Sequence, residues 1–355
     1  MSQRERLGAE ELAIVLSYFD VGPIRSIKEF PRGSRRAPKL LVTAKNGQFL
    51  LKRRAKGKDD PFKVAFSHAL QLYLASKQFP LPHLVGTRTD NNSMLQLNGH
   101  VYELFEFIRG GPYDASVEAT ADAGKILALY HRLLRDYTPE FDPPVGSYHD
   151  AIPINTGIDQ IPVTFNRLEQ LQNISQEQVN ATLSFLRDAY IQAAVAVNEA
   201  GLREWPIQIV HSDWHPGNML FLNRRVVAVI DYDAARLQQR VIDLANGALQ
   251  FSIIGSAEEP QSWPDHVDEP RFVAFIRGYD DVDVISTAEL QVIPHLMVEA
   301  LVAESVLPIA ATGSFGRIEG YGFLQMIERK VRWIKQRGAA LVGDLTRGES
   351  GAVAG

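Results

Sequence analysis

The sequence contains no cysteine. This absence excludes disulfide bonds, thiolate zinc sites, iron–sulfur clusters and a cysteine nucleophile. An excess of positive charge is also missing: 37 Lys and Arg face 42 Asp and Glu, so we expect no nucleic-acid partner. No apolar run approaches the ~18 residues of a membrane span, and residues 1–7 lead into no signal-type hydrophobic stretch. We therefore expect a cytoplasmic protein without membrane attachment.

The chain has 355 residues, which is too long for one small core and predicts two lobes or domains. Hydrophobic residues make up 45% and charged residues 22%, a balance that is typical of a folded globular protein. The first 60 residues hold 14 Lys and Arg against 7 Asp and Glu, although the whole chain has a net charge of −5. A basic head on an acidic body indicates an element that contacts phosphate, but lysine-rich loops produce the same asymmetry.

The head has the pattern of a small sheet with two helices. A Lys-Asn-Gly hairpin signal joins strand patterns at 40–44 and 48–53. Asp60-Pro61 has the form of an N-cap followed by proline in the first helical turn. We expect further strands at 24–30, 93–97 and 100–107, and helices at 10–18 and from 61 to about 77.

Helical patterns dominate beyond a hinge near residues 106–112. We expect helices at 117–134, at 176–200 and in several places after 271, interrupted by strands at 207–210, 219–222 and 226–230. The sequence therefore predicts an α+β protein with an N-terminal lobe (1–108), a larger, mostly helical C-terminal lobe (109–340) and a flexible tail (341–355).

Polar side chains follow two strands of this interruption. His211-x-Asp213-x-x-x-x-Asn218 lies in a loop after the first strand. Asp231-x-Asp233 follows the last one. Phosphoryl transfer requires a carboxylate that orients and deprotonates an attacking hydroxyl, and oxygen ligands that hold Mg²⁺ against the phosphates. Asp213 fits the first role, and Asn218 and Asp231 fit the second.

These two motifs resemble the catalytic and metal-binding loops of the aminoglycoside phosphotransferase and choline kinase family, with wording close to H-x-D-x-x-x-x-N and I-D-[FWY]-[DE]. Here the second motif reads Ile230-Asp231-Tyr232-Asp233. The resemblance implies a bilobal, protein-kinase-like fold whose small β-rich N-lobe binds nucleotide. It also implies an enzyme that uses ATP and Mg²⁺ to phosphorylate a hydroxyl of a small molecule, such as an amino alcohol, a homoserine-like metabolite, an amino sugar or an aminoglycoside.

The resemblance extends to the head. Lys52 matches the strand lysine that such kinases direct at the nucleotide phosphates, and Gly33 and Ser34 occupy the place of the phosphate-covering loop. That loop has one glycine where protein kinases use several. The helix that follows offers His68 where such kinases place a glutamate, so the phosphates themselves or another carboxylate would hold Lys52. Homoserine-kinase-like and spore-coat-kinase-like branches tolerate such departures.

The remaining roles implied by the resemblance lie in two segments. Residues 102–108 resemble the link between the lobes, so the backbone of Glu106, Phe107 and Ile108 is expected to receive adenine. Asp243 matches a buried aspartate that braces the catalytic loop. His211 is expected to buttress the same loop through hydrogen bonds.

Other interpretations stay open. The single glycine of the phosphate-covering loop and the presence of His68 favour a catalytically silent, nucleotide-binding pseudokinase. The residues His211, Asp213 and His215 fit a zinc-dependent hydrolase. Asp233 fits a second metal contact or a helix N-cap. The acceptor is expected to meet the helical body, where several acidic residues fit an amine: Asp280, Asp281, Glu299 and Glu304. A monomer and a homodimer are both compatible with the sequence, as is any of the acceptors named above.

Overall fold

The computed structural model describes residues 5–31, 36–170, 174–255 and 259–350. The chain divides into two compact units. Unit 1 consists of Met1–Tyr113, Tyr137–Pro143 and Gly217–Ala235, and unit 2 of Asp114–Asp136, Pro144–Pro216 and Arg236–Gly355. Two short segments from further along the sequence, Tyr137–Pro143 and Gly217–Ala235, thus belong with the N-terminal part. The boundary expected near residue 108 stays a prediction.

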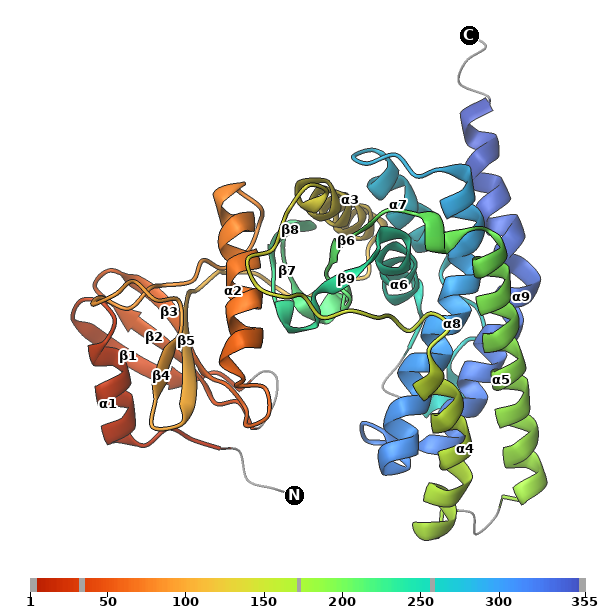
Figure 1. Ribbon diagram of the computed structural model, residues 1–355, viewed down its shortest axis with the longest axis horizontal. Coiled ribbons are helices and arrows are strands. Elements are labelled where there is room, and N and C mark those ends of the chain that lie inside the picture. Colours follow the sequence, from red (N-terminus) through yellow and green to blue (C-terminus); the bar gives the residue numbers. More distant parts are fainter. Residues whose placement is uncertain (1–4, 32–35, 171–173, 256–258, 351–355) are drawn as a thin grey trace. The chain divides into compact units, whose positions relative to one another are not determined.

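Unit 1 is built on a five-stranded antiparallel sheet with the order β1-β2-β3-β5-β4 (Figure 1). The strands are β1 (Ile24–Glu29), β2 (Lys39–Ala44), β3 (Gly47–Arg53), β4 (Leu95–Leu97) and β5 (His100–Glu106). One face packs on helix α1 (Ala9–Ser17), where Val15 of the helix and Leu51 of β3 are fully buried in the same core. Side chains alternate along a strand, so the residues next to Leu51 face the other side of the sheet.

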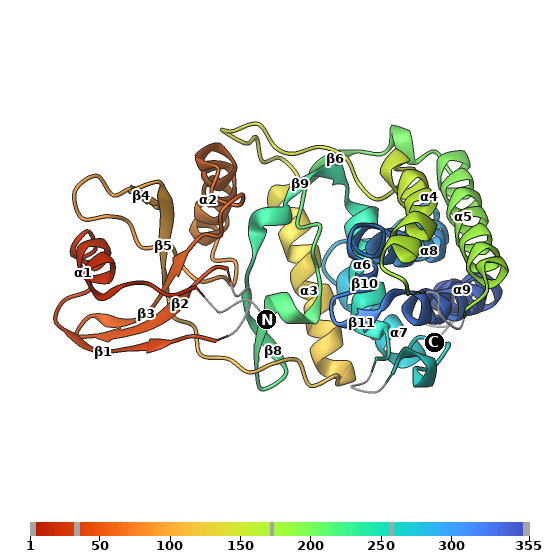
Figure 2. The same ribbon diagram turned by 90° about the horizontal axis from the view of Figure 1, so that it is seen from below.

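Helix α2 (Pro61–Ser76) packs on that other side (Figure 2). The His68 side chain of this helix contacts Glu103 of β5. The helix begins where the sequence predicts, because the Asp60 side chain accepts a hydrogen bond from the Phe62 amide (3.0 Å) and Pro61 takes the first helical position. Strands β7 (Met219–Leu222) and β8 (Arg225–Val229) form a hairpin in the same unit. Backbone hydrogen bonds of 2.7 and 2.9 Å between Gly111 and Phe221 attach it.

Unit 2 is mostly helical. Its helices are α3 (Val117–Leu134), α4 (Ile152–Arg167), α5 (Gln176–Glu199), α6 (Arg240–Ser252), α7 (Glu269–Asp280), α8 (Thr287–Thr312) and α9 (Gly320–Ser350). Antiparallel pairs join β6 (Ile207–Val210) to β9 (Arg236–Gln239) and β10 (Ser314–Phe315) to β11 (Ile318–Glu319). Gly124 and Gly278 let α3 and α7 touch backbone to backbone: a Cβ at either would lie 2.2 or 2.1 Å from a carbonyl oxygen of the other helix.

The tail expected from residue 341 overlaps the last helix as far as residue 350, and its flexibility stays a prediction. Helix α9 continues through Ser350. Its apolar residues Leu341, Val342 and Leu345 are buried, so the Gly- and Ala-rich composition does not prevent packing. Residues 351–355 lie outside the described part of the chain.

One helix of the described residues, α8, is long and apolar enough to cross a membrane, although no such run was expected. Glu299, Glu304 and two prolines interrupt its sequence and hide the apolar window. Within the protein 78% of that window is buried, as in a core helix.

Candidate functional site

Lys52 projects from β3 on the face of the sheet opposite α1. In the ladder between β3 and β5 it lies directly across from Glu103. The Lys52 ammonium Nζ is 3.2 Å from Glu103 Oε2, and the Glu103 side chain is fully buried. Adjacent strands thus bring a lysine and a carboxylate together without help from a helix.

Glu103 holds two further nitrogen groups. The Nε2 atom of His68 lies 2.8 Å from its Oε1, and the Arg54 guanidinium donates to the same oxygen at 2.7 Å. Burial by itself raises the pKa of the Glu103 carboxyl, but Lys52, His68 and Arg54 outweigh burial and hold that pKa well below its usual range. Glu103 therefore stays ionised and gives Lys52 a permanent counter-charge.

Sequence reasoning missed Glu103 and left open whether the phosphates or another carboxylate would hold Lys52. The structure has the second arrangement, with the carboxylate on a strand and His68 beside it. One signal in the sequence pointed to it: Glu103 stands between the apolar residues Tyr102 and Leu104 in a buried strand, where an ionised residue needs a partner.

The predicted nucleotide contacts have different outcomes. Gly33 and Ser34 lie outside the described residues. In the linking segment, the amides of Glu106 and Phe107 already donate to the carbonyls of His83 and Gln48, both at 2.9 Å. An adenine ring would therefore use other backbone groups of this segment, such as the amide of Ile108.

Asn218 and Asp231 lie at the same end of the β7–β8 hairpin. Met219 pairs with Val229, and the amide of Ile230 donates to the Asn218 carbonyl at 2.9 Å. Asp231 follows with a positive φ of 67°, a conformation that non-glycine residues adopt at a cost. A carboxylate and an amide carbonyl are the oxygen donors that Mg²⁺ prefers, and the metal keeps its other positions for water and phosphate. The donor set thus fits Mg²⁺.

Asp233, two residues further on, is engaged by Arg54. Its Oδ1 accepts from Arg54 Nη2 at 2.9 Å. The sequence left a second metal contact and an N-cap as alternatives, and this ion pair is a third arrangement.

In unit 2 the loop after β6 is fastened by Asp243 of α6. The buried Asp243 carboxylate accepts the backbone amides of His211 and Ser212, each at 2.9 Å. Ser212 has a positive φ of 61°, so this turn is strained and needs such support. Asp213 follows directly, and its side chain is 46% exposed. These contacts are the ones that the predicted bracing role requires.

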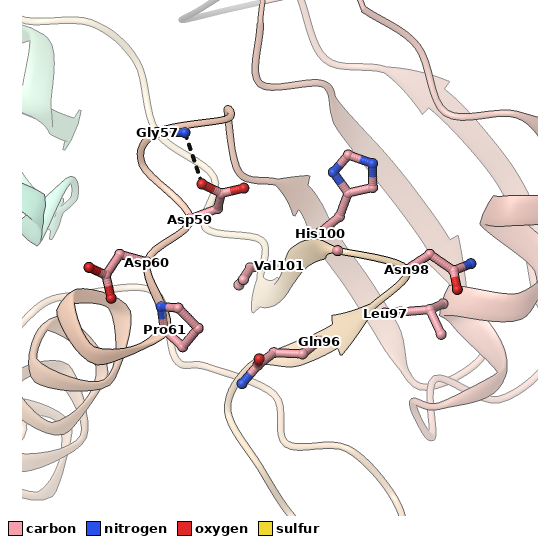
Figure 3. A pocket seen from close by; sticks show the side chains of 10 residues that line it. Gly57, Asp59, Asp60, Pro61, Gln96, Leu97, Asn98, His100 and Val101 are labelled. Atoms are coloured by element: carbon pink, nitrogen blue, oxygen red, sulfur yellow. Dashed lines mark hydrogen bonds between the residues drawn. The ribbon is translucent and has the colours of Figure 1, made fainter.

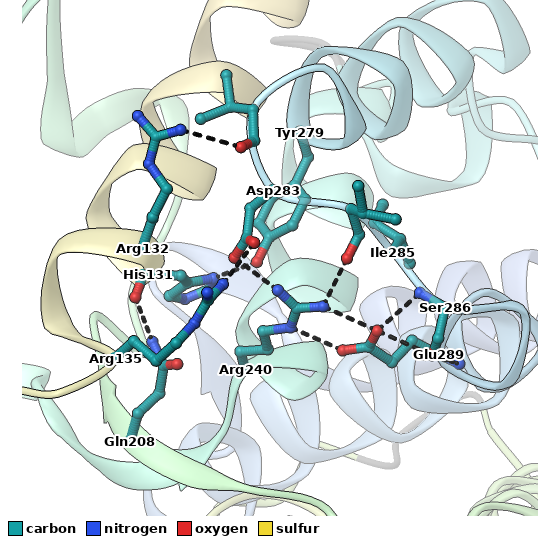
Figure 4. A network of polar contacts seen from close by, with 12 residues as sticks. His131, Arg132, Arg135, Gln208, Arg240, Tyr279, Asp283, Ile285, Ser286 and Glu289 are labelled. Carbon is teal, nitrogen blue, oxygen red and sulfur yellow. Dashed lines mark hydrogen bonds and ion pairs between the residues drawn. The ribbon is translucent and has the colours of Figure 1, made fainter.

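A polar network continues beyond Asp243, and Figure 4 shows its members His131, Tyr279, Arg240 and Glu289. Asp243 Oδ2 lies 3.2 Å from Nε2 of His131, whose Nδ1 is 2.8 Å from the Tyr279 hydroxyl. The Arg240 guanidinium lies over the Tyr279 ring, 5.9 Å from its centre, and pairs with Glu289 at 2.7 Å. His131 is thus a core histidine with partners on both nitrogens.

The zinc alternative finds no support in the part of the chain that the structure describes, which contains no group of three or more His, Asp or Glu residues placed to hold a metal. The His215 Nε2 atom lies 3.6 Å from Asp213 Oδ1. The buried His211 ring instead packs edge-on against Trp214, with ring centres 5.3 Å apart.

Two of the four acidic residues expected to meet an amine are occupied by contacts near them in the fold. Asp280 accepts the amide of Ile285 at 2.7 Å, and Asp281 pairs with Lys125 at 3.1 Å.

The other two acidic residues belong to α8. Glu299 is fully buried and accepts from the His149 ring and the Asp150 amide, both at 3.0 Å. Glu304 is exposed as a residue, but its carboxylate lies close to many protein atoms and accepts from Gln250 at 2.6 Å. Desolvation by the surrounding protein, followed by the Asp213 carboxylate, raises the pKa of Glu304 to about 7. Among these four acidic residues, Glu304 is the one whose pKa is raised by the charge of Asp213.

Unit 1 also has a pocket of about 460 Å³ between the loop 57–61 and the β4–β5 turn (Figure 3). Asp59 accepts the Gly57 amide at 2.9 Å in its wall. None of the predicted site residues lines it, so its volume does not mark the site.

A strand lysine with a buried counter-carboxylate, an oxygen-donor turn and a braced His-x-Asp loop are the groups that phosphoryl-transfer enzymes use. Residues 26–284 match the phosphotransferase enzyme family (APH), and the chain belongs to this family. The predicted class of enzyme, a phosphotransferase acting on hydroxyl groups of small molecules, is thereby confirmed.

The chain is similar to a homoserine kinase from Rhodopseudomonas palustris, with 26% identity over 237 residues; the match covers 64% of either chain, less than two thirds of that relative's length. The microcompartment-associated aminopropanol kinase has a similar structure, with a TM-score of 0.69, 14% identity and coverage of 94% of this chain and 99% of that chain. Amicoumacin kinase in complex with AMP-PNP, Ca²⁺ and Ami has a TM-score of 0.63 at 11% identity, with coverage of 93% and 94%. The predicted protein-kinase-like α+β fold is confirmed.

Proposed function

We propose that this chain transfers the γ-phosphoryl group of ATP to a hydroxyl group of a small molecule and uses Mg²⁺. The observation that carries the proposal is the ion pair of 3.2 Å between Lys52 and the buried Glu103, which fixes a positive charge on the sheet for the phosphates. Asn218 and Asp231 supply oxygen donors in the same unit. The complex of amicoumacin kinase with a nucleotide analogue and a divalent cation supports the same cofactors.

The proposed chemistry needs few protein groups. Asp213 accepts a hydrogen bond from the acceptor hydroxyl and takes its proton while the new oxygen–phosphorus bond forms. The bond from the γ-phosphorus to the bridging oxygen breaks, and ADP leaves with that electron pair. Lys52 neutralises charge on the α and β phosphates. Asn218 and Asp231 hold Mg²⁺, which when bound neutralises further phosphate charge.

The other predicted residues bind or support. The backbone around Glu106, Phe107 and Ile108 receives adenine, and Gly33 and Ser34 cover the phosphates. The hydrogen bonds from the loop amides to Asp243 keep Asp213 in place, with His211 packed beneath. Positioning then accounts for most of the rate enhancement.

We further propose that the acceptor is an amino alcohol. Homoserine and aminopropanol, named in two similar kinases, each carry an amine and a hydroxyl. In unit 2 Glu304 is an exposed residue and its carboxyl interacts electrostatically with Asp213, which suits an ammonium group on a molecule whose hydroxyl reaches Asp213.

The test is an ADP-release assay with Mg²⁺ and a panel of compounds that carry both an amine and a hydroxyl: the amino alcohols aminopropanol and ethanolamine, and the hydroxy amino acid homoserine. Alcohols of the same length without the amine are the matched controls. We expect turnover with at least one amino alcohol and little with its control. Nucleotide binding without ADP release from any compound would favour the silent pseudokinase instead. Cytoplasmic residence and a monomeric or homodimeric state belong to the proposal, and cell fractionation and light scattering test them.

A further inference from the structure

Arg54 is a buried arginine that connects two parts of unit 1. Its Nη2 atom donates to Glu103 at 2.7 Å and to Asp233 at 2.9 Å, and its Nη1 donates to the Lys58 carbonyl at 3.1 Å. The side chain is only 5% exposed. A guanidinium presents five donors in a rigid plane, so a single Arg54 can serve both carboxylates at once, as a lysine ammonium cannot with the same geometry.

Each of the two carboxylates that Arg54 joins lies beside a proposed functional group. Glu103 is the counter-charge of Lys52. Asp233 lies in the short turn Tyr232–Ala234, which begins directly after Asp231. Tyr232 is buried at 2% exposure and anchors one side of this turn. Arg54 holds the other side.

This arrangement gives the turn a fixed relation to the sheet. Asp231 has a positive φ, so its backbone conformation is maintained by the contacts of its neighbours. Desolvation alone lowers the pKa of Arg54, but Glu103 and Asp233 outweigh it and raise that pKa, so the guanidinium is always charged. If either carboxylate moved away, the buried guanidinium would lose one of its two charged partners.

We propose that Arg54 is a positioning residue that ties the turn bearing Asp231 to the strand bearing Lys52. Asp231 and Lys52 then keep a fixed position relative to each other before the nucleotide binds. This inference rests on the proposed roles of Lys52 and Asp231, and it adds a residue for which the sequence motifs provide no position.

The test compares Arg54→Lys with Arg53→Gln. Arg53 is the matched control, because it is the neighbouring arginine, is similarly buried and pairs with Glu5 and Glu11 on the opposite face of the sheet. Calorimetry measures the affinity for ADP without metal and the gain in that affinity when Mg²⁺ is added, and thermal melting verifies folding.

We expect Arg54→Lys to bind ADP without metal within about threefold of the parent protein and to lose about tenfold of the gain from Mg²⁺. Arg53→Gln should keep the full gain. An Arg54→Lys protein with an undiminished gain, or an Arg53→Gln protein with the same loss, would overturn the role of Arg54. A parent protein that binds no nucleotide would instead overturn the proposed function, and this role with it.

Asp233→Asn tests the link from its other end and leaves the contact between Arg54 and Glu103 in place. If Arg54 acts through Asp233, this variant loses a similar part of the Mg²⁺ gain, and combining it with Arg54→Lys adds little. Fully additive losses would show that the two residues act separately and would contradict the proposal.

Discussion

Each unit contains a buried carboxylate that organises the proposed site, but the two carboxylates bind different partners. In unit 1, Glu103 binds side chains, among them the Lys52 ammonium and the Arg54 guanidinium. In unit 2, Asp243 binds two backbone amides, those of His211 and Ser212. A carboxylate that pairs with a long, flexible side chain such as that of Lys52 can project from any of several neighbouring strands or helices. A carboxylate that accepts a backbone amide must lie at the one position to which that N–H group points. The carboxylate can therefore change its element in unit 1 more easily than in unit 2.

The largest expected effect separates the chemistry of the loop from its support. Asp213→Asn removes the proposed base but keeps the hydrogen bonds that fasten the loop to Asp243. We expect turnover to fall about 10²- to 10⁴-fold, with ADP affinity unchanged, because general base catalysis contributes about that much. Steady-state ADP release and calorimetry provide the two measurements. Unchanged turnover would refute the assignment of Asp213.

Asp243→Ala tests the backbone-binding carboxylate. Two backbone amides and the His131 ring lose their acceptor, so we expect the free energy of unfolding to fall by about 3–5 kcal/mol and turnover to fall with it. Urea unfolding measures the first effect. Asp243→Asn, which keeps one carbonyl acceptor, is the control and should lose less. Equal losses in both variants would mean that the charge, and not the amide contacts, matters.

Glu103→Gln tests the side-chain-binding carboxylate and has a smaller expected effect. It removes the charge between Lys52 and Arg54 while keeping the shape and one acceptor oxygen, so we expect a loss of about 1.5–3 kcal/mol of stability. The KM for ATP should be about tenfold higher.

The exchange variant Glu103→Gln with His68→Glu sharpens this test. The His68 ring lies 2.8 Å from the Glu103 carboxylate, so a glutamate at position 68 puts the charge back from the helix. We expect the KM for ATP to return at least partly to its parent value. If the second substitution raises the KM for ATP further, the carboxylate that pairs with Lys52 has to lie on the strand. Glu103 would then be as restricted in its position as Asp243.

The same contrast explains which features the sequence could predict. His211 and Asp243 both belong to motifs that occur in the same order along the chain in the family that the sequence resembles. Asp243 could therefore be expected to support the catalytic loop, and its hydrogen bond with the His211 amide is present. Glu103 follows Lys52 by 51 positions and meets it only through the pairing of β3 with β5, which a reading of local motifs does not include. The β3–β5 register becomes visible only once the sheet order is known.

Local sequence signals located the start of a predicted helix well, but they did not reveal every helix. Asp60 and Pro61 located the start of α2 to the residue. Helix α4 was not predicted, because Pro153 and Pro162 are typical of helix ends, yet its apolar residues recur at helical spacing and are buried: Ile154, Ile158, Ile161 and Phe165. Tertiary burial decides there against local propensity.

The smallest expected effect concerns a carboxylate of a third kind, the exposed Glu304. Its pKa of about 7 exceeds the unfolded value of 4.5, so the folded chain holds this proton more tightly. Stability from this group is therefore present below about pH 4.5 and is lost as the pH rises through about 7. Glu304→Gln, which cannot ionise, should melt at a higher temperature than the parent protein at pH 8 and at a similar one at pH 4.

The same variant distinguishes a destabilised carboxylate from one that binds substrate. An ammonium acceptor would favour the ionised form of Glu304, so Glu304→Gln should raise the KM for an amino alcohol several-fold at pH 8 and leave the KM for ATP unchanged. Exposed Glu319, which caps the start of α9 through the Tyr321 amide (2.8 Å), provides a control substitution, Glu319→Gln. Glu304→Gln could instead gain stability at pH 8 and keep its KM for the amino alcohol. That outcome would show that Glu304 does not bind the ammonium group, and the amine must then be bound elsewhere.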